Sequence, residues 1–207
     1  MANVIFDFDG TLADTFPLIV DVAYKLSPQT KRRSIAEIER LRQMPLLNSF
    51  LHLGIPLVGM PRLIRNTRKK LAASIGQVPP FAGVPEMFKS LHAAGHKLFI
   101  LSSNYPENIR SFLKYNKLEH YITDVRGVSW GNTPIKSLAL RRLADKYNLE
   151  PSESYHVGNE GLDMRAARWA GMRGIGVTWS GYDRARLARS KPFATIATPA
   201  ELPKLLQ

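Results

Sequence analysis

Two carboxylates, Asp7 and Asp9, stand one residue apart at the end of an apolar stretch near the start of the chain. Residues 3–8 predict a short buried strand that runs into a loop at Gly10. Side chains two positions apart on an extended chain point the same way, so the two acids could share one metal ion or one proton-transfer task. Asp and Gly are also ordinary turn residues. Like charges beside an apolar strand are costly without a cation, however, and this favours a functional role.

The elements that position these acids alternate along the chain. After residue 80, helical and strand-like segments follow one another, which predicts an α/β fold with a Rossmann-like parallel sheet and ligands at the carboxyl ends of its strands. The further predicted strands are residues 97–101, 121–125, 154–157 and 174–178. The predicted helices are residues 84–94, 106–116, 134–147 and 161–170.

A helical pattern without strands occupies the segment between the first strand and this alternation. Ser34 and Glu37 form a capping box, and Pro61 fits the first turn of a basic helix. The segment holds 11 Lys and Arg residues against 4 Asp and Glu. We therefore expect an α/β core of residues 1–13 and 81–207 and a small helical cap of residues 14–80.

Composition excludes several classes of protein. The 207 residues contain no Cys, so there is no disulfide, thiolate metal site or Cys nucleophile. The net charge of +12 indicates an anionic partner: nucleic acid, a membrane surface or a phosphorylated metabolite. No nucleic-acid motif is recognisable, and no apolar stretch has the length and continuity to span a membrane. We expect a soluble, cytoplasmic protein without a membrane partner, and nucleic acid is not favoured. The sequence leaves the oligomeric state open.

The stretch FDFDGTLADT, from Phe6 to Thr15, resembles the first motif, DxDGT, of the haloacid dehalogenase superfamily of phosphohydrolases. It is similar to the phosphoglycolate phosphatase-like branch. Ser102 ends a predicted strand and Lys136 opens a predicted helix, as the second and third motifs require. The segments GIGVTW and TPAEL look like the last strand and the terminal helix of the family. The resemblance covers nearly the whole chain outside residues 14–80.

This resemblance implies a Mg²⁺-dependent phosphatase that hydrolyses a small phosphorylated metabolite through an aspartyl-phosphate. Asp7 would be the nucleophile, and Asp9 would protonate the leaving oxygen and then activate water. A helical cap would close over the site. The residues implied to bind the phosphoryl group are Thr11, Ser102, Ser103 and Lys136. Those implied to hold Mg²⁺ are Asp7, Asp9, Asn159 and Asp163.

The fourth motif of the family, GDxxxD, is altered in this chain. Asn159 stands where the motif has its first acid, while Asp163 keeps the second. An amide oxygen still coordinates magnesium but brings no charge, so the cation would bind more weakly. Glu160 or Asp163 could replace the ligand, directly or through water. The alternative function is a catalytically weak or inactive protein of the same fold with a regulatory or polyanion-binding role.

Overall fold

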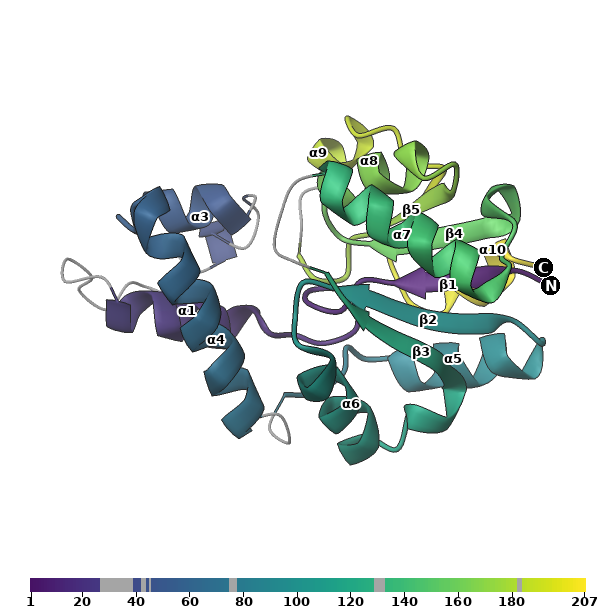
Figure 1. The fold of residues 1–207 in the computed structure, drawn as a ribbon, viewed down its shortest axis with the longest axis horizontal. Coiled ribbons are helices and arrows are strands. Elements are labelled where there is room, and N and C mark those ends of the chain that lie inside the picture. Colours follow the sequence, from purple (N-terminus) through teal and green to yellow (C-terminus); the bar gives the residue numbers. More distant parts are fainter. Residues whose placement is uncertain (27–38, 42–43, 45, 75–77, 129–132, 182–183) are drawn as a thin grey trace.

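A six-stranded parallel sheet forms the centre of the computed structural model (Figure 1). The structure describes residues 1–26, 39–41, 44, 46–74, 78–128, 133–181 and 184–207. The strands are β1 (Asn3–Phe6), β2 (Lys97–Ser102), β3 (Ile122–Gly127), β4 (Ser154–Gly158), β5 (Arg173–Val177) and β6 (Ala194–Ile196). Their order across the sheet is β3-β2-β1-β4-β5-β6. The predicted α/β class with a parallel sheet is confirmed.

Helices cover both faces of this sheet (Figure 1). The helices after β1 are α1 (Phe16–Leu26), α3 (Leu46–His52), α4 (Met60–Ser74), α5 (Val84–Ala93), α6 (Pro106–Tyr115), α7 (Thr133–Tyr147), α8 (Gly161–Trp169), α9 (Arg184–Ala188) and α10 (Glu201–Leu205). Ile5 and Phe99 pack with α7 and α8 on one face, whereas Val4, Phe6 and Ile100 pack with α5 and α6 on the other. Neighbouring residues of one strand thus enter opposite layers, as the period of two in a strand requires.

The predicted helices and strands after residue 80 are confirmed to within two residues at each end. The first strand is shorter than the predicted span of residues 3–8 and ends at Phe6. Beyond it, Asp9 forms an isolated bridge with Ala13, and Gly10 adopts φ +76°, so the chain is already turning. The turn takes both acids out of the strand and into the loop above it.

The last strand is not the GIGVTW segment, which forms β5. A further strand, β6, pairs with β5 in parallel, with Ile175 opposite Ala194 and Val177 opposite Ile196. Only Ile196 of its three residues is buried, so the apolar signal of a strand is too short to recognise. The terminal helix expected at TPAEL is present as α10. Among the described residues, no helix has the length and apolar character needed to cross a membrane.

The described part of the segment between β1 and α5 contains helices and no strand. Helices α1, α3 and α4 stand beside the sheet in Figure 1. Ile19 of α1 and Leu63 of α4 share a separate apolar cluster with Leu53, the residue that follows α3. Lys70 of α4 pairs with Asp21 of α1. The predicted helix start near Pro61 is confirmed by α4, whereas the predicted capping box at residues 34–37 lies outside the described residues.

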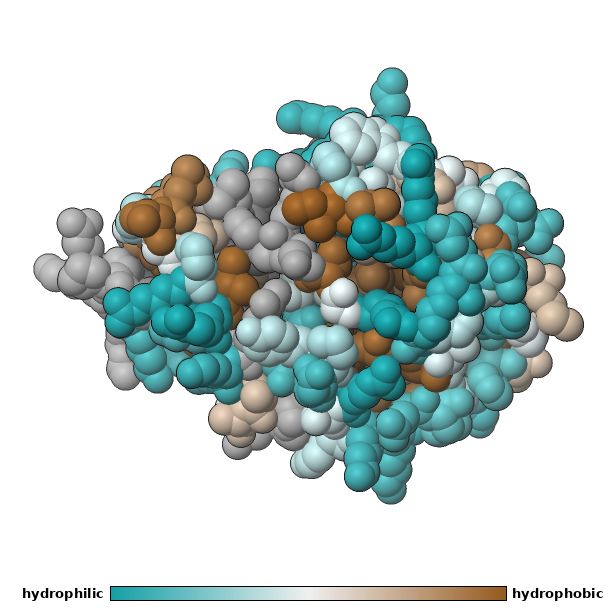
Figure 2. All heavy atoms as spheres, viewed as in Figure 1, coloured by the Kyte–Doolittle hydropathy of each residue, from teal (hydrophilic) through white to brown (hydrophobic). Residues whose placement is uncertain are grey.

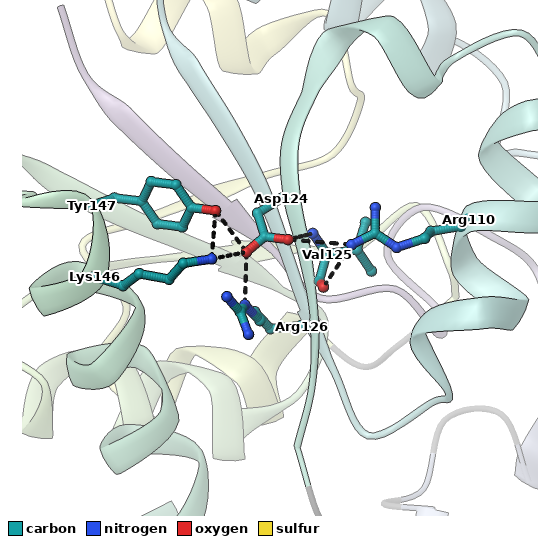
Figure 3. Close-up of polar contacts among 6 residues, drawn as sticks. All are labelled: Arg110, Asp124, Val125, Arg126, Lys146 and Tyr147. Atoms are coloured by element: carbon teal, nitrogen blue, oxygen red, sulfur yellow. Dashed lines mark hydrogen bonds and ion pairs between the residues drawn. The ribbon is translucent and has the colours of Figure 1, made fainter.

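A buried aspartate on the edge strand of the sheet, Asp124, forms ion pairs with three basic side chains (Figure 3). Asp124 of β3 lies within 3.3 Å of Arg110, 2.7 Å of Arg126 and 3.1 Å of Lys146, and it accepts a hydrogen bond of 2.7 Å from the Tyr147 hydroxyl. Burial opposes ionisation of Asp124. The hydrogen bonds from Tyr147, Lys146 and Arg126 outweigh it, however, and lower the pKa of Asp124 to about 2.

We expect Asp124→Asn to lower the free energy of unfolding at neutral pH by about 1 kcal/mol, because its cationic partners are half exposed and solvent screens part of the interaction. The folded pKa is depressed, so this stability is present above the unfolded pKa of about 4 and is lost as pH falls toward 2. Urea unfolding between neutral pH and about pH 2 should show the difference in the free energy of unfolding between Asp124→Asn and wild type decreasing to zero. A difference that persists at the lowest pH would mean that the Asp124 ion pairs do not cause it.

Candidate active site

The first candidate residue, Asp7, lies where the strand order of the sheet reverses. Strand β1 has β2 on one side and β4 on the other, with Phe6 in register with Ile100 and Val157. The backbone N–H of Asp7 still donates to the carbonyl of Val157 at 2.8 Å, which fixes the first residue beyond the strand. Such a switch point opens a crevice at the carboxyl ends of the strands, where ligands of doubly wound sheets bind.

Lys136 joins two acids that the sequence places far apart. Its ammonium lies 3.1 Å from Asp7 Oδ1 and 2.5 Å from Asp163 Oδ1. The other carboxylate oxygen of Asp163 accepts the backbone N–H of Glu160 at 2.9 Å, which completes a capping box at the start of α8. Both oxygens of Asp163 therefore contact donors of the protein itself. A Cβ on Gly158 would collide with this carboxylate, so only glycine allows the approach.

A buried histidine, His156, packs against Asp163 on the side of the sheet. His156 of β4 is fully buried, and its Nδ1 lies 2.9 Å from the carbonyl oxygen of Ile5. Its Nε2 lies 3.5 Å from Asp163 Oδ1. Burial lowers the pKa of His156, so the neutral ring, with its proton on Nδ1, suits this position. His156 thus packs behind Asp163 as a core residue.

The electrostatics of the group favour a charged Lys136. Burial alone would lower the pKa of Lys136, but the carboxylates of Asp163 and Asp7 raise it above its usual value. Burial would raise the pKa of Asp163, whereas Lys136 holds it well below its usual range. Burial raises the pKa of Asp7 to about 7: Lys136 opposes the rise, and the negative charges of Asp163 and Asp9 add to it. The group thus has three carboxyl groups, those of Asp7, Asp9 and Asp163, against the single ammonium of Lys136.

Asp9 is held by a residue that sequence reasoning missed. Asn104 follows β2, is buried, and donates from Nδ2 to the two carboxylate oxygens of Asp9 at 3.3 and 3.4 Å. Its own amide oxygen accepts hydrogen bonds from the side chain of Asn108 and the backbone N–H of Tyr105. These contacts fix the amide with its NH₂ group toward Asp9, so Asn104 orients that carboxylate.

Ser102 and Ser103 lie at the end of β2 beside this asparagine. Ser102 is fully buried, and its hydroxyl accepts the backbone N–H of Asn104 at 3.1 Å. Ser103 is half-buried one position farther along. The structure brings both serines to the same edge of the sheet as Asp7, as their place in the sequence predicts, and the Ser102 hydroxyl orders the loop.

Asn159 contacts the loop of the two acids. Its Oδ1 is 3.5 Å from the buried hydroxyl of Thr11, and its Nδ2 is 3.4 Å from the hydroxyl of Ser180. Gly10 lies so close beneath this amide that a Cβ there would clash with it. The Trp179 indole donates to the Thr11 carbonyl at 2.9 Å and braces the same loop.

A cavity of about 60 Å³ opens between the acids and the helical segment. Asp9, Asn159 and Glu160 line one side, and Phe16 and Ile19 of α1 line the other. Thr15, also on this lining, is buried, and its hydroxyl has no hydrogen-bond partner among the described residues. A buried hydroxyl without a partner is costly, so it is suited to contact a ligand or water in this cavity.

The oxygen donors at this edge fit a hard divalent cation. Within the described parts of the chain, no three His, Asp or Glu side chains converge on one metal position. A metal would therefore need a mixed set of ligands: a carboxylate, a backbone carbonyl and an amide oxygen, which suit magnesium. Burial raises the pKa of Asp7, and the charges of Asp163 and Asp9 raise it further, so a cation beside Asp7 would favour its ionised form.

The family model of the haloacid dehalogenase-like hydrolases matches residues 4–177. The chain belongs to this family. A phosphoglycolate phosphatase from Synechococcus elongatus is 32% identical over 206 residues, which cover 98% of this chain and 95% of that protein. Together with the family match, this relative identifies a hydrolase of the phosphatase type.

Solved structures agree with the family fold. A haloacid dehalogenase-like hydrolase from Streptococcus pneumoniae superposes with a TM-score of 0.81 at 20% identity, covering 100% of this chain and 99% of that one. A hydrolase from Pseudomonas syringae superposes with a TM-score of 0.74 at 26% identity, covering 99% and 97%. The similarity extends over the helical segment as well as the sheet.

Proposed function

We propose that this phosphatase hydrolyses a small phosphate monoester, with phosphoglycolate as the first candidate, through a phosphorylated Asp7 and with Mg²⁺. The observation that carries the proposal is the contact of one buried ammonium, Lys136, with both Asp7 and Asp163. This arrangement holds the nucleophile in place and supplies positive charge where a phosphoryl group would arrive. The substrate suggestion comes from the names of the relatives.

The proposed reaction has two displacements. The Asp7 carboxylate attacks phosphorus and the ester P–O bond breaks, while Asp9 donates its proton to the leaving oxygen. Asp9, now a carboxylate, then takes a proton from water, whose oxygen attacks phosphorus and releases Asp7 and inorganic phosphate. Asn104 supports this exchange because it fixes the Asp9 carboxylate from one side.

The remaining residues would bind the phosphoryl oxygens and the cation. The hydroxyl and backbone N–H groups that can donate to these oxygens lie at the carboxyl edge of the sheet. Ser102 and Ser103 lie at the end of β2, and Thr11 lies in the loop that follows β1. Magnesium bound at Asp7, the Asp9 carbonyl and Asn159 would supply positive charge to the transferring group. For Asp163, the contacts with Lys136 and Glu160 favour a positioning role, and magnesium ligation by Asp163 remains a prediction.

The cap is proposed to be residues 14–80, over a core of residues 1–13 and 81–207. The apolar side chains of Phe16 and Ile19 line the same cavity of about 60 Å³ as Asp9. This is room for a few water molecules, so it favours a small leaving group. Closure would exclude water during the first displacement, as mobile lids do in other enzymes.

A phosphate-release assay tests this function. The substrates should include phosphoglycolate and ethyl phosphate, a matched pair that differs in the carboxylate, each with and without Mg²⁺. We expect release from small monoesters to require Mg²⁺, and preference for phosphoglycolate to reveal recognition of its carboxylate. If phosphate were released from none of the phosphorylated metabolites, the proposed catalytic function would be wrong.

Asn159 favours one alternative, a weak or inactive member of the family that binds polyanions. Its neutral amide reduces the charge available to a cation. Salt-dependent binding of nucleic acid without phosphate release would support this alternative.

We expect Asn159→Asp to tighten Mg²⁺ binding by about tenfold, or about 1.4 kcal/mol, since a carboxylate adds one negative charge beside the cation. The hydroxyls of Thr11 and Ser180 can donate to the new carboxylate, so the local contacts survive. Calorimetric titration with Mg²⁺ in the absence of substrate measures the change. Asn148→Asp, on an exposed turn, adds the same charge elsewhere and should leave the affinity unchanged. Equal affinity in wild type and Asn159→Asp would mean that residue 159 does not contact the cation.

A further inference from the structure

A second and larger cavity, of about 410 Å³, lies beside the sheet edge between β3 and α7. None of the described residues lines both this cavity and the cavity at Asp9. Figure 2 shows this face, where apolar side chains are recessed among hydrophilic ones over α7 and β3. The volume is in the range of small-molecule sites.

The charged residues among the described lining of this second cavity are all positive. Arg126, Arg142 and Lys146 contribute to it, and no Asp or Glu is among its described lining residues. Asp124 lies behind, bound to Arg126 at 2.7 Å and to Lys146 at 3.1 Å. The side chains of Arg126 and Lys146 are 45% and 48% exposed. Asp124 therefore holds both cations in place while each remains accessible to a ligand from solvent. Because Asp124 supplies only one negative charge, the three basic side chains of the cavity keep an excess of positive charge.

The other lining is apolar and partly open to solvent. Ile135 and Leu138 of α7 are 41% and 48% exposed, and Leu101, Val128 and Leu143 line the same cavity. Exposed branched side chains next to fixed cations match a ligand that has an anionic end and an apolar body. Two guanidinium groups and one ammonium favour a multiply charged phosphate over a single carboxylate.

We propose that this second cavity binds a phosphorylated small molecule with an apolar body, at a site separate from the catalytic one. The phosphate would contact Arg126, Arg142 and Lys146, and the body would cover Ile135 and Leu138. Helix α7 also carries Lys136 in its first turn, so the ligand would contact the same helix that positions the catalytic ammonium. The overall charge of +12 adds to the attraction for such an anion.

Methyl NMR of the full chain with hexylphosphonate tests the site, because a phosphonate carries the same charged group without a hydrolysable ester. Ile135 reports this cavity, and Ile19 reports the catalytic cavity. We expect the Ile135 methyl signal to shift saturably with hexylphosphonate and to show weaker binding of inorganic phosphate, which has no apolar body.

Two variants separate the charged and apolar contributions. Arg142→Gln should weaken hexylphosphonate binding at Ile135 by about fivefold, the loss expected for one solvent-screened charged contact. Arg141→Gln, the neighbouring arginine outside the cavity lining, should leave it unchanged. Leu138→Ser should weaken hexylphosphonate but not inorganic phosphate. The proposal is overturned if only Ile19 shifts, if Ile135 does not shift, or if Arg142→Gln binds as wild type does.

Discussion

Asp7→Asn should abolish turnover while the protein remains folded. The amide cannot attack phosphorus, so we expect kcat to fall by about 10⁴-fold or more, as for other nucleophiles removed from hydrolases. The free energy of unfolding should change by less than about 1 kcal/mol, because the variant loses one contact of Lys136 but also removes a buried carboxylate. Steady-state phosphate release and urea unfolding measure the two effects.

Asp145→Asn provides the matched control for this variant. Asp145 is an exposed acid on α7, and the same substitution there should leave both kcat and stability unchanged. If Asp7→Asn kept a substantial share of wild-type turnover, Asp7 would not be the nucleophile. If it failed to fold, the loss of activity would carry no information on chemistry, and the unfolding measurement detects this.

Lys136→Met should be the most destabilising single change at this site. It leaves the carboxylates of Asp7 and Asp163 buried without their cation, which costs about 3 kcal/mol at neutral pH. The contribution of Asp163, whose pKa is depressed, is present above the unfolded pKa of about 4 and is lost as pH falls below it. Asp7, whose pKa is raised to about 7, does not lower the stability of wild type as pH falls from 7 to about 4. In the variant, protonation of the buried acids relieves the cost of their unpaired charge, so the stability difference from wild type should narrow on acidification and vanish below about pH 4. Phosphate release should fall as well.

Lys89→Met, on the exposed face of α5, removes the same charge without a buried partner and should have little effect. Urea unfolding of the three proteins between neutral pH and about pH 3 tests the argument. A constant difference between wild type and Lys136→Met over that range would show that Asp163 is not an ionised partner of Lys136.

Most of the sheet could be predicted because its signals are local. Buried parallel strands are nearly continuous apolar runs, and β2, with four apolar residues at positions 98–101, is recognisable in this way. The exceptions have a physical cause. Strand β6 has one buried residue, and β1 ends before its two acids because the chain turns at Gly10.

The candidate site could be predicted only in part, because spacing in sequence does not give the direction of a side chain. The spacing of Asn159 and Asp163 suggests two metal ligands, yet Asp163 points both oxygens at protein donors. Asn104 belongs to no pattern visible in one sequence, and Thr15 ends the FDFDGTLADT stretch without a role that the stretch assigns to it. Their importance appears only once the fold places Asn104 against Asp9 and buries the Thr15 hydroxyl at the catalytic cavity.

The stereochemical course at phosphorus tests the central claim, a phosphorylated Asp7, most directly. A phosphate ester made chiral with oxygen isotopes would be hydrolysed by wild type in isotopically defined water, and the configuration of the released phosphate would be determined. Each in-line displacement inverts phosphorus, so attack by Asp7 followed by attack of water predicts net retention. Net inversion would mean that water attacks the ester in a single step, and it would contradict the account.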